Sequence, residues 1–179
     1  MKKTFLFIKI KSLIIISPEK SLLKKAKDAL LLIKNVDSKE YIKIFSRLNI
    51  VFITNKNGFS NEFFMPEKIW FVNKSVIKNN DLKWLASLII HEAFHATQFK
   101  NGKYVLPFGE KLERPAIDLQ EKFLKRIKDL SSKKQLESEF KRKYWKEIED
   151  DELSYSYFRN LLRLFETKKL KLMKIKTGL

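Results

Sequence analysis

The chain has 179 residues, of which 44% are hydrophobic, so it can form a folded domain that buries roughly two-thirds of its unfolded surface. It contains no cysteine, which excludes disulfides, thiolate zinc sites and a cysteine nucleophile. The net charge of +17 comes from 32 Lys and 6 Arg against 21 acidic residues. Because arginine is scarce, this charge favours a lysine-rich, solvated surface and supports nucleic-acid binding only weakly.

The amino-terminal residues are apolar but interrupted. The basic start Met1–Lys3 and the apolar run Thr4–Ile8 look like the beginning of a signal peptide, yet Lys9 and Lys11 follow at once. A secretory segment has about 7–15 uninterrupted apolar residues. The sequence therefore favours a first strand or a packed segment and a cytoplasmic protein, with export as the alternative. No stretch approaches the roughly 18 apolar residues of a membrane span.

Helices and then strands are predicted in the first half of the chain. Ser17–Glu19 marks a helix start, apolar residues recur at helical spacing to Ile33, and Ser38 begins a shorter helix. Three β-branched or aromatic runs then predict strands, at Asn49–Thr54, Phe63–Met65 and Ile69–Val72. Leu82–Phe99 is strongly helical; it follows a cluster of capping residues, Asn79–Asp81.

Only helices are predicted in the last third of the chain, beginning near Arg114, Ser131 and Asp150. This order predicts the α+β class, with an N-terminal helical segment, a short, mostly antiparallel sheet of about three strands, one long central helix and C-terminal helices. We expect a single domain over residues 1–179. Its core covers about residues 49–130, and a helical extension covers about residues 131–179.

The central helix contains the segment His91-Glu92-Ala93-Phe94-His95. Residues four apart lie on one face of a helix, so the two imidazoles can occupy two corners of a tetrahedral zinc site. Glu92 projects beside the metal and can take a proton from a water whose pKa the metal lowers. His91 and His95 are the only histidines in the chain, which favours a metal site over two ordinary surface histidines.

The run Trp84–Gln98 resembles the active-site helix of the zincin metallopeptidases, in which a hydrophobic stretch precedes His-Glu-x-x-His. The resemblance covers about residues 49–130 and is closest to small bacterial or phage-type members. It implies a zincin-like domain in which zinc serves the hydrolysis of peptide bonds. It also implies that the strand before the helix, Ile69–Val72, is an edge strand that aligns an extended substrate.

A third zinc ligand must be a carboxylate, because the chain has no other His and no Cys. Such a ligand set resembles the gluzincin branch, which uses two His and one Glu. We select Glu113, which lies 18 residues after His95 and begins Glu113–Ala116, a segment similar to the Glu-x-x-Ala of many gluzincins. The alternative is a solvated Glu favoured by the helix dipole. The other candidates are Glu110, Asp118 and Glu121.

Further residues are candidates for supporting roles. Gln98 follows His95 by three residues and faces either the site or a helix interface, and Gln120 shares a helix face with Glu113. A group that stabilises the oxyanion is also expected. The tyrosine candidates for that role, which could equally be core or interface residues, are Tyr104, Tyr155 and Tyr157, with Arg159 nearby.

These observations predict a zinc-dependent peptidase, most simply an endopeptidase, that acts on a peptide or protein. His91, His95 and Glu113 hold the zinc, and Glu92 is the general base. Three alternatives stay open. The first is a regulatory metalloprotease acting on a DNA-associated partner, which the positive charge supports weakly. The second is an inactive binding module with a zincin fold, against which the intact Glu92 argues. The third is an exported effector protease.

Overall fold

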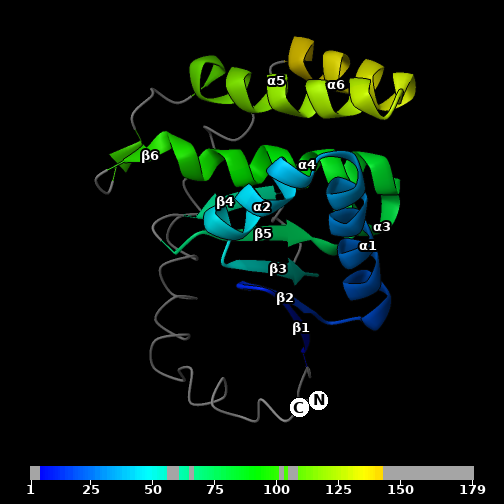
Figure 1. Cartoon of the computed structure of the whole chain (residues 1–179), viewed down its shortest axis with the longest axis vertical. Helices are drawn as coiled ribbons and strands as arrows, with labels where there is room; N and C mark the ends of the chain where they lie inside the picture. Colours follow the sequence, from blue (N-terminus) through cyan, green and yellow to red (C-terminus); the bar gives the residue numbers. More distant parts are fainter. Residues whose placement is uncertain (1–4, 56–60, 65–66, 101–102, 105–108, 143–179) are drawn as a thin grey trace. The chain divides into compact units, whose positions relative to one another are not determined.

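A computed structural model describes residues 5–55, 61–64, 67–100, 103–104 and 109–142 (Figure 1). The chain divides into two compact units, Met1–Trp145 and Lys146–Leu179, and every described residue belongs to the first. This unit combines helices with a sheet, which confirms the expected α+β class. The single domain over residues 1–179 stays a prediction, and the helix expected near Asp150 lies outside the described residues.

Five of the described strands form one mixed sheet in the order β1–β2–β3–β5–β4. Its outer pairs, β1–β2 and β4–β5, are antiparallel, whereas β2–β3 and β3–β5 are parallel. The sheet thus has two strands more than the three that the sequence predicts, and half of its pairings are parallel. The parallel pairing of β2 with β3 follows from the two helices that connect them. The strands are β1 (Leu6–Ile10), β2 (Leu13–Ser17), β3 (Ile50–Thr54), β4 (Asn61–Phe64) and β5 (Ile69–Asn73).

The first two strands form a hairpin in the region where the sequence predicts a strand or a packed segment. Lys11 and Ser12 make the turn, and Lys11 has a φ of 53°, a conformation that glycine adopts at lower cost. Contacts from α2 hold this turn. Nζ of Lys11 lies 5.3 Å from the ring centroid of Tyr41 and 5.1 Å from that of Phe45. Oγ of Ser12 donates a hydrogen bond of 2.9 Å to the backbone oxygen of Phe45.

The helices begin at side-chain caps in several places. Oδ1 of Asp37 accepts from the backbone N–H of Glu40 at the start of α2, and Oδ1 of Asp81 accepts from that of Trp84 at the start of α4, at 2.7 Å. The described helices are α1 (Lys20–Val36), α2 (Ser38–Arg47), α3 (Lys74–Asn79), α4 (Leu82–His95), the 3₁₀ turn η1 (Ala96–Gln98), α5 (Glu110–Arg126) and α6 (Leu130–Arg142). A two-stranded ladder follows η1, made of β6 (Phe99–Lys100) and β7 (Lys103–Tyr104).

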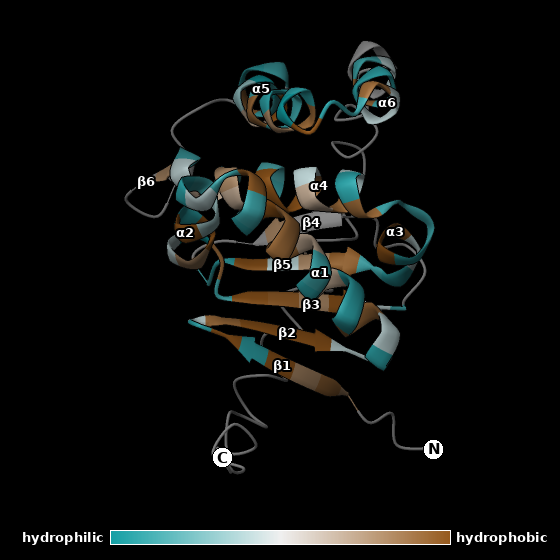
Figure 2. Cartoon of the chain, turned by 45° about the vertical axis from the view of Figure 1, so that its right-hand side comes forward, coloured by the Kyte–Doolittle hydropathy of each residue, from teal (hydrophilic) through white to brown (hydrophobic). Residues whose placement is uncertain are grey.

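Helix α4 lies between α1 and α5 and is buried on nearly every side (Figure 1). On one side, Leu85 and Ile89 join the main core, which also contains Trp70 of β5. On the other side, Trp84 packs with Ile117 of α5 in a second cluster. Strands β2, β3 and β5 are hydrophobic along their length, whereas α1 and α5 carry both polar and apolar faces (Figure 2). The fold therefore places the His-Glu-x-x-His segment at the end of a buried helix.

Candidate metal centre

His91 and His95 lie one turn apart at the C-terminal end of α4 and point the same ring nitrogen toward each other. Their Nε2 atoms are 3.2 Å apart, and their ring centroids are 4.9 Å apart. Both residues are buried, with exposed fractions of 4% and 7%. The helical spacing of four residues accounts for the shared face. The packing of α4 between other elements accounts for the burial.

Glu113 completes the cluster from the first turn of α5. Its Oε2 lies 3.2 Å from Nε2 of His91, and its Oε1 lies 3.6 Å from Nε2 of His95. Gly109, with a φ of 89°, precedes the helix, which starts at Glu110. The helix thus begins before Arg114, near which the sequence predicts its start, and Pro115 lies inside it. Glu113 itself does lie in the first turn, where the helix dipole favours a carboxylate.

The other carboxylate candidates for a third ligand lie outside this cluster. Asp118 pairs with Arg114 at 2.9 Å and is about half exposed, and Glu110 is exposed in the first turn of α5. Glu121 pairs with Lys125 at 2.9 Å, and this hydrogen bond lowers the pKa of Glu121. Among the described residues, the group able to hold a metal ion consists of His91, His95 and Glu113.

The three side chains lie close enough together to share one metal ion. Zinc binds nitrogen and oxygen ligands at about 2.0–2.1 Å, so two tetrahedral corners are about 3.3 Å apart. The Nε2–Nε2 distance of 3.2 Å lies close to that value. The two carboxylate oxygens of Glu113 each face one imidazole, with Oε2 at 3.2 Å from Nε2 of His91 and Oε1 at 3.6 Å from Nε2 of His95. When one ligand atom is taken from each of His91, His95 and Glu113, the three atoms lie within 4.8 Å of one another. The three side chains therefore form a group that is able to hold a metal ion, and nitrogen and oxygen are donors that zinc accepts.

The second ring nitrogen of His95 is held by a side-chain amide. Nδ1 of His95 lies 2.7 Å from Oε1 of Gln98, which is itself buried in the 3₁₀ turn after α4. Nε2 of Gln98 donates a hydrogen bond of 2.5 Å to the backbone oxygen of Leu112, the residue before Glu113. The sequence allowed Gln98 to face either the site or a helix interface. In the structure its side chain contacts His95, one of the residues of the cluster.

The second ring nitrogen of His91 has a different environment. Its Nδ1 is buried, and no hydrogen bond from the described residues reaches it. The Gln120 side chain is nevertheless close enough to favour the protonated ring. Nε2 of Gln120 donates to Oγ of Ser87 at 3.1 Å, and this hydroxyl donates to the backbone oxygen of Trp84 at 2.7 Å. The sequence did not identify Ser87 as a hydrogen-bond partner of Gln120.

The two imidazoles have opposite protonation preferences. Burial disfavours the charged form of His91 most strongly, but the hydrogen bond to Glu113 and the charges of Glu92 and Glu113 outweigh it and raise the pKa of His91. Burial and the neighbouring charge of His91 lower the pKa of His95 to about 4. His95 is therefore neutral near pH 7, which is the form that binds a metal.

The structure gives fewer contacts for the candidate general base and for the candidate oxyanion groups. Glu92 is buried, with an exposed fraction of 4%, and its charge acts on His91. Tyr104 lies in β7 and pairs with Phe99 through the backbone, but its side chain is outside the described part. The sequence also did not single out Phe63 of β4, whose ring centroid is 6.4 Å from that of His95. Tyr155 and Tyr157, with Arg159, lie outside the described residues.

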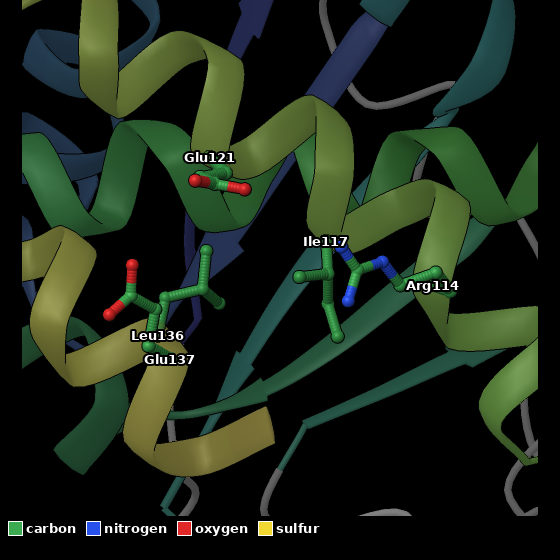
Figure 3. A pocket seen from close by; sticks show the side chains of 5 residues that line it. All are labelled: Arg114, Ile117, Glu121, Leu136 and Glu137. Carbon is green, nitrogen blue, oxygen red and sulfur yellow. The ribbon is translucent and has the colours of Figure 1, made fainter. Parts of the chain in front are cut away.

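A hollow on the surface lies between α5 and α6 and shares no residue with the metal cluster (Figure 3). Apolar and oppositely charged side chains line it together, with no set of convergent polar groups. Its lining consists of Arg114, Ile117 and Glu121 of α5 and Leu136 and Glu137 of α6. The residues able to hold a metal ion therefore lie at the end of α4 and the start of α5, and not in this hollow.

None of the described helices is both long and apolar enough to cross a membrane. Comparison of the chain with known protein families, with characterised proteins and with solved structures finds no match. The cluster of His91, His95 and Glu113 is therefore the feature of the described residues that bears on function.

Proposed function

We propose that the protein is a zinc-dependent peptidase that hydrolyses peptide bonds. The observation that carries this proposal is the convergence of His91, His95 and Glu113 in one group able to hold a metal ion, with Glu92 directly after the first of these residues. Metallopeptidases need this combination, because the ligands hold the ion while a separate carboxylate moves protons. Burial of the cluster is consistent with a site that limits the access of bulk water.

The residues have distinct roles in this proposal. Nε2 of His91, Nε2 of His95 and the carboxylate of Glu113 hold the ion. Bound zinc supplies Lewis-acid activation of water and of the substrate carbonyl. The carboxylate of Glu92 takes a proton from the attacking water and passes it to the nitrogen of the leaving amine. Glu92 is buried, and its charge acts on the first of the proposed ligands, His91.

The strand that would align the substrate differs from the sequence-based expectation. The sequence assigns this role to Ile69–Val72, but β5 lies inside the sheet, paired with β3 on one side and β4 on the other. Strand β4 is one of the two edges of the described sheet, β1 being the other, and the ring of Phe63 in β4 lies near His95. In the proposed function an extended peptide pairs with β4, through the backbone groups that an edge strand offers.

The test compares the wild type with Glu92→Gln, which keeps the size of the side chain and removes its basicity. Zinc content and hydrolysis of casein or of fluorogenic peptides are measured on the same preparations. We expect full zinc in both proteins and a loss of about 10²–10⁴-fold or more in the rate for the variant. Glu110→Gln, an exposed position on α5, is the matched control and should keep both properties.

Two results would contradict the proposal. Equal hydrolysis rates with full zinc in the wild type and in Glu92→Gln would remove Glu92 from the mechanism. Full zinc without any hydrolysis in either protein would instead favour a binding module that retains the metal.

A further inference from the structure

The side-chain amide of Gln98 is oriented by the backbone oxygen of Leu112. The backbone oxygen of Leu112 can only accept a hydrogen bond, so the amide nitrogen of Gln98, 2.5 Å away, must face it. The amide oxygen then faces Nδ1 of His95 at 2.7 Å. Because that oxygen can only accept, Nδ1 must carry the proton of the neutral ring. The lone pair is therefore on Nε2, the atom that points at His91 and Glu113.

The same amide joins two segments of the chain that carry ligands. Gln98 follows His95 by one 3₁₀ turn, and Leu112 directly precedes Glu113 in α5. The side chain therefore spans from the second ligand on α4 to the backbone beside the third ligand on α5. Gln98 has an exposed fraction of 4%, so solvent does not compete effectively for these two hydrogen bonds.

We propose that Gln98 is a positioning residue that holds His95 as the Nδ1–H tautomer and ties it to the segment of α5 that carries Glu113. This inference rests on the proposed zinc site, whose ligands it orients. Loss of such an outer partner typically costs about 10–100-fold in metal affinity. Gln98 should reach the upper part of that range, because one side chain orients two of the three ligands.

The experiment uses the full chain and the variant Gln98→Met, which keeps the length of the side chain but removes both hydrogen bonds. Gln135→Met is the matched control, since Gln135 is exposed on α6. Zinc affinity is measured by competition with a chromophoric chelator. The tautomer is read at pH 8 from long-range ¹H–¹⁵N spectra of metal-free protein with labelled histidine, in which only His91 and His95 contribute.

We expect His95 to be the Nδ1–H tautomer in the wild type and in the control. In Gln98→Met it should become a mixture, with zinc affinity about 10–100-fold lower. A folded Gln98→Met protein with unchanged affinity and an unchanged tautomer would overturn the proposal. So would an Nε2–H tautomer of His95 in the wild type.

A second variant keeps the proposal testable if Gln98→Met does not fold. Gln98→Glu retains an oxygen for Nδ1 of His95 but loses the N–H that reaches Leu112, so the tautomer should persist while zinc affinity falls. Loss of the tautomer in this variant would count against the proposal. If the wild type binds no zinc, the proposed function fails, and the tautomer in the metal-free protein still decides the role of Gln98.

Discussion

Removal of the metal should lower the thermal stability of the protein by a large and measurable amount. The proposed ligands come from two helices, with His91 and His95 at the end of α4 and Glu113 at the start of α5. Their side chains are at most 13% exposed, so they are held close together away from water. Only the folded chain presents these groups together, and the free energy of zinc binding therefore adds to that of folding.

The size of the effect follows from ligand linkage. Free zinc at about a thousand times its Kd stabilises the folded state by about 4 kcal/mol. For chains of roughly 150–250 residues each kcal/mol changes Tm by about 2–4 °C. Zinc should therefore raise Tm by roughly 8–16 °C. The metal-free protein should stay folded, because the Ser87–Gln120 hydrogen bond still joins α4 to α5 and the Gln98–Leu112 hydrogen bond still joins η1 to α5.

The assay is scanning calorimetry of zinc-loaded and chelator-treated protein, with His91→Ala and Glu110→Gln scanned beside the wild type. The wild type and Glu110→Gln should show the full shift, since Glu110 is exposed and lies outside the cluster. His91→Ala should show almost none. The same Tm with and without zinc in the wild type, or an undiminished shift in His91→Ala, would refute the reasoning.

Three further predictions concern the cluster and the helices around it. Glu113→Gln should weaken zinc binding by more than about 100-fold in chelator competition, whereas Glu110→Gln should not; equal affinities would exclude Glu113 as a ligand. Ser87→Ala removes the acceptor of the Gln120 amide and should cost about 1–3 kcal/mol in urea unfolding, and an unchanged midpoint would show that this bond contributes little. Asp129→Ala should cost about 1 kcal/mol at pH 7, because the buried carboxylate caps α6. Burial opposes the ionisation of Asp129, but hydrogen bonds from Ser132 and Ser131 of α6 outweigh it and lower the pKa of Asp129 below 3.8. The contribution to stability is therefore present above pH 3.8 and lost as the pH falls through the lowered pKa, so a cost that does not change as the pH is lowered would contradict it.

The grouping of the metal cluster could be predicted from sequence because local geometry determines most of it. Two histidines four residues apart share a helix face in any α-helix. The absence of other histidines and of cysteine left only carboxylates for the third position. The partners of the second ring nitrogens could not be predicted in the same way. The contacts of Ser87 and of the Leu112 carbonyl depend on how α4 packs against α5, which no local pattern encodes.

The sheet shows where local signals fail. The turn between β1 and β2 contains Lys11 at a positive φ in place of the Asn or Gly that marks most tight hairpins. The rings of Tyr41 and Phe45 contact Lys11 from a helix far along the chain, so the turn depends on tertiary packing. The position of β5 inside the sheet likewise depends on β4 pairing beyond it. A strand's own residues do not reveal whether another strand covers its edge.

The most direct test of the central claim is an anomalous difference map at the zinc absorption edge, from crystals of the protein purified with zinc. We predict one zinc peak at about 2.0–2.1 Å from Nε2 of His91 and of His95, and at about 2.0–2.2 Å from a carboxylate oxygen of Glu113. A peak held by other residues, or no peak at the end of α4 in zinc-saturated crystals, would contradict it.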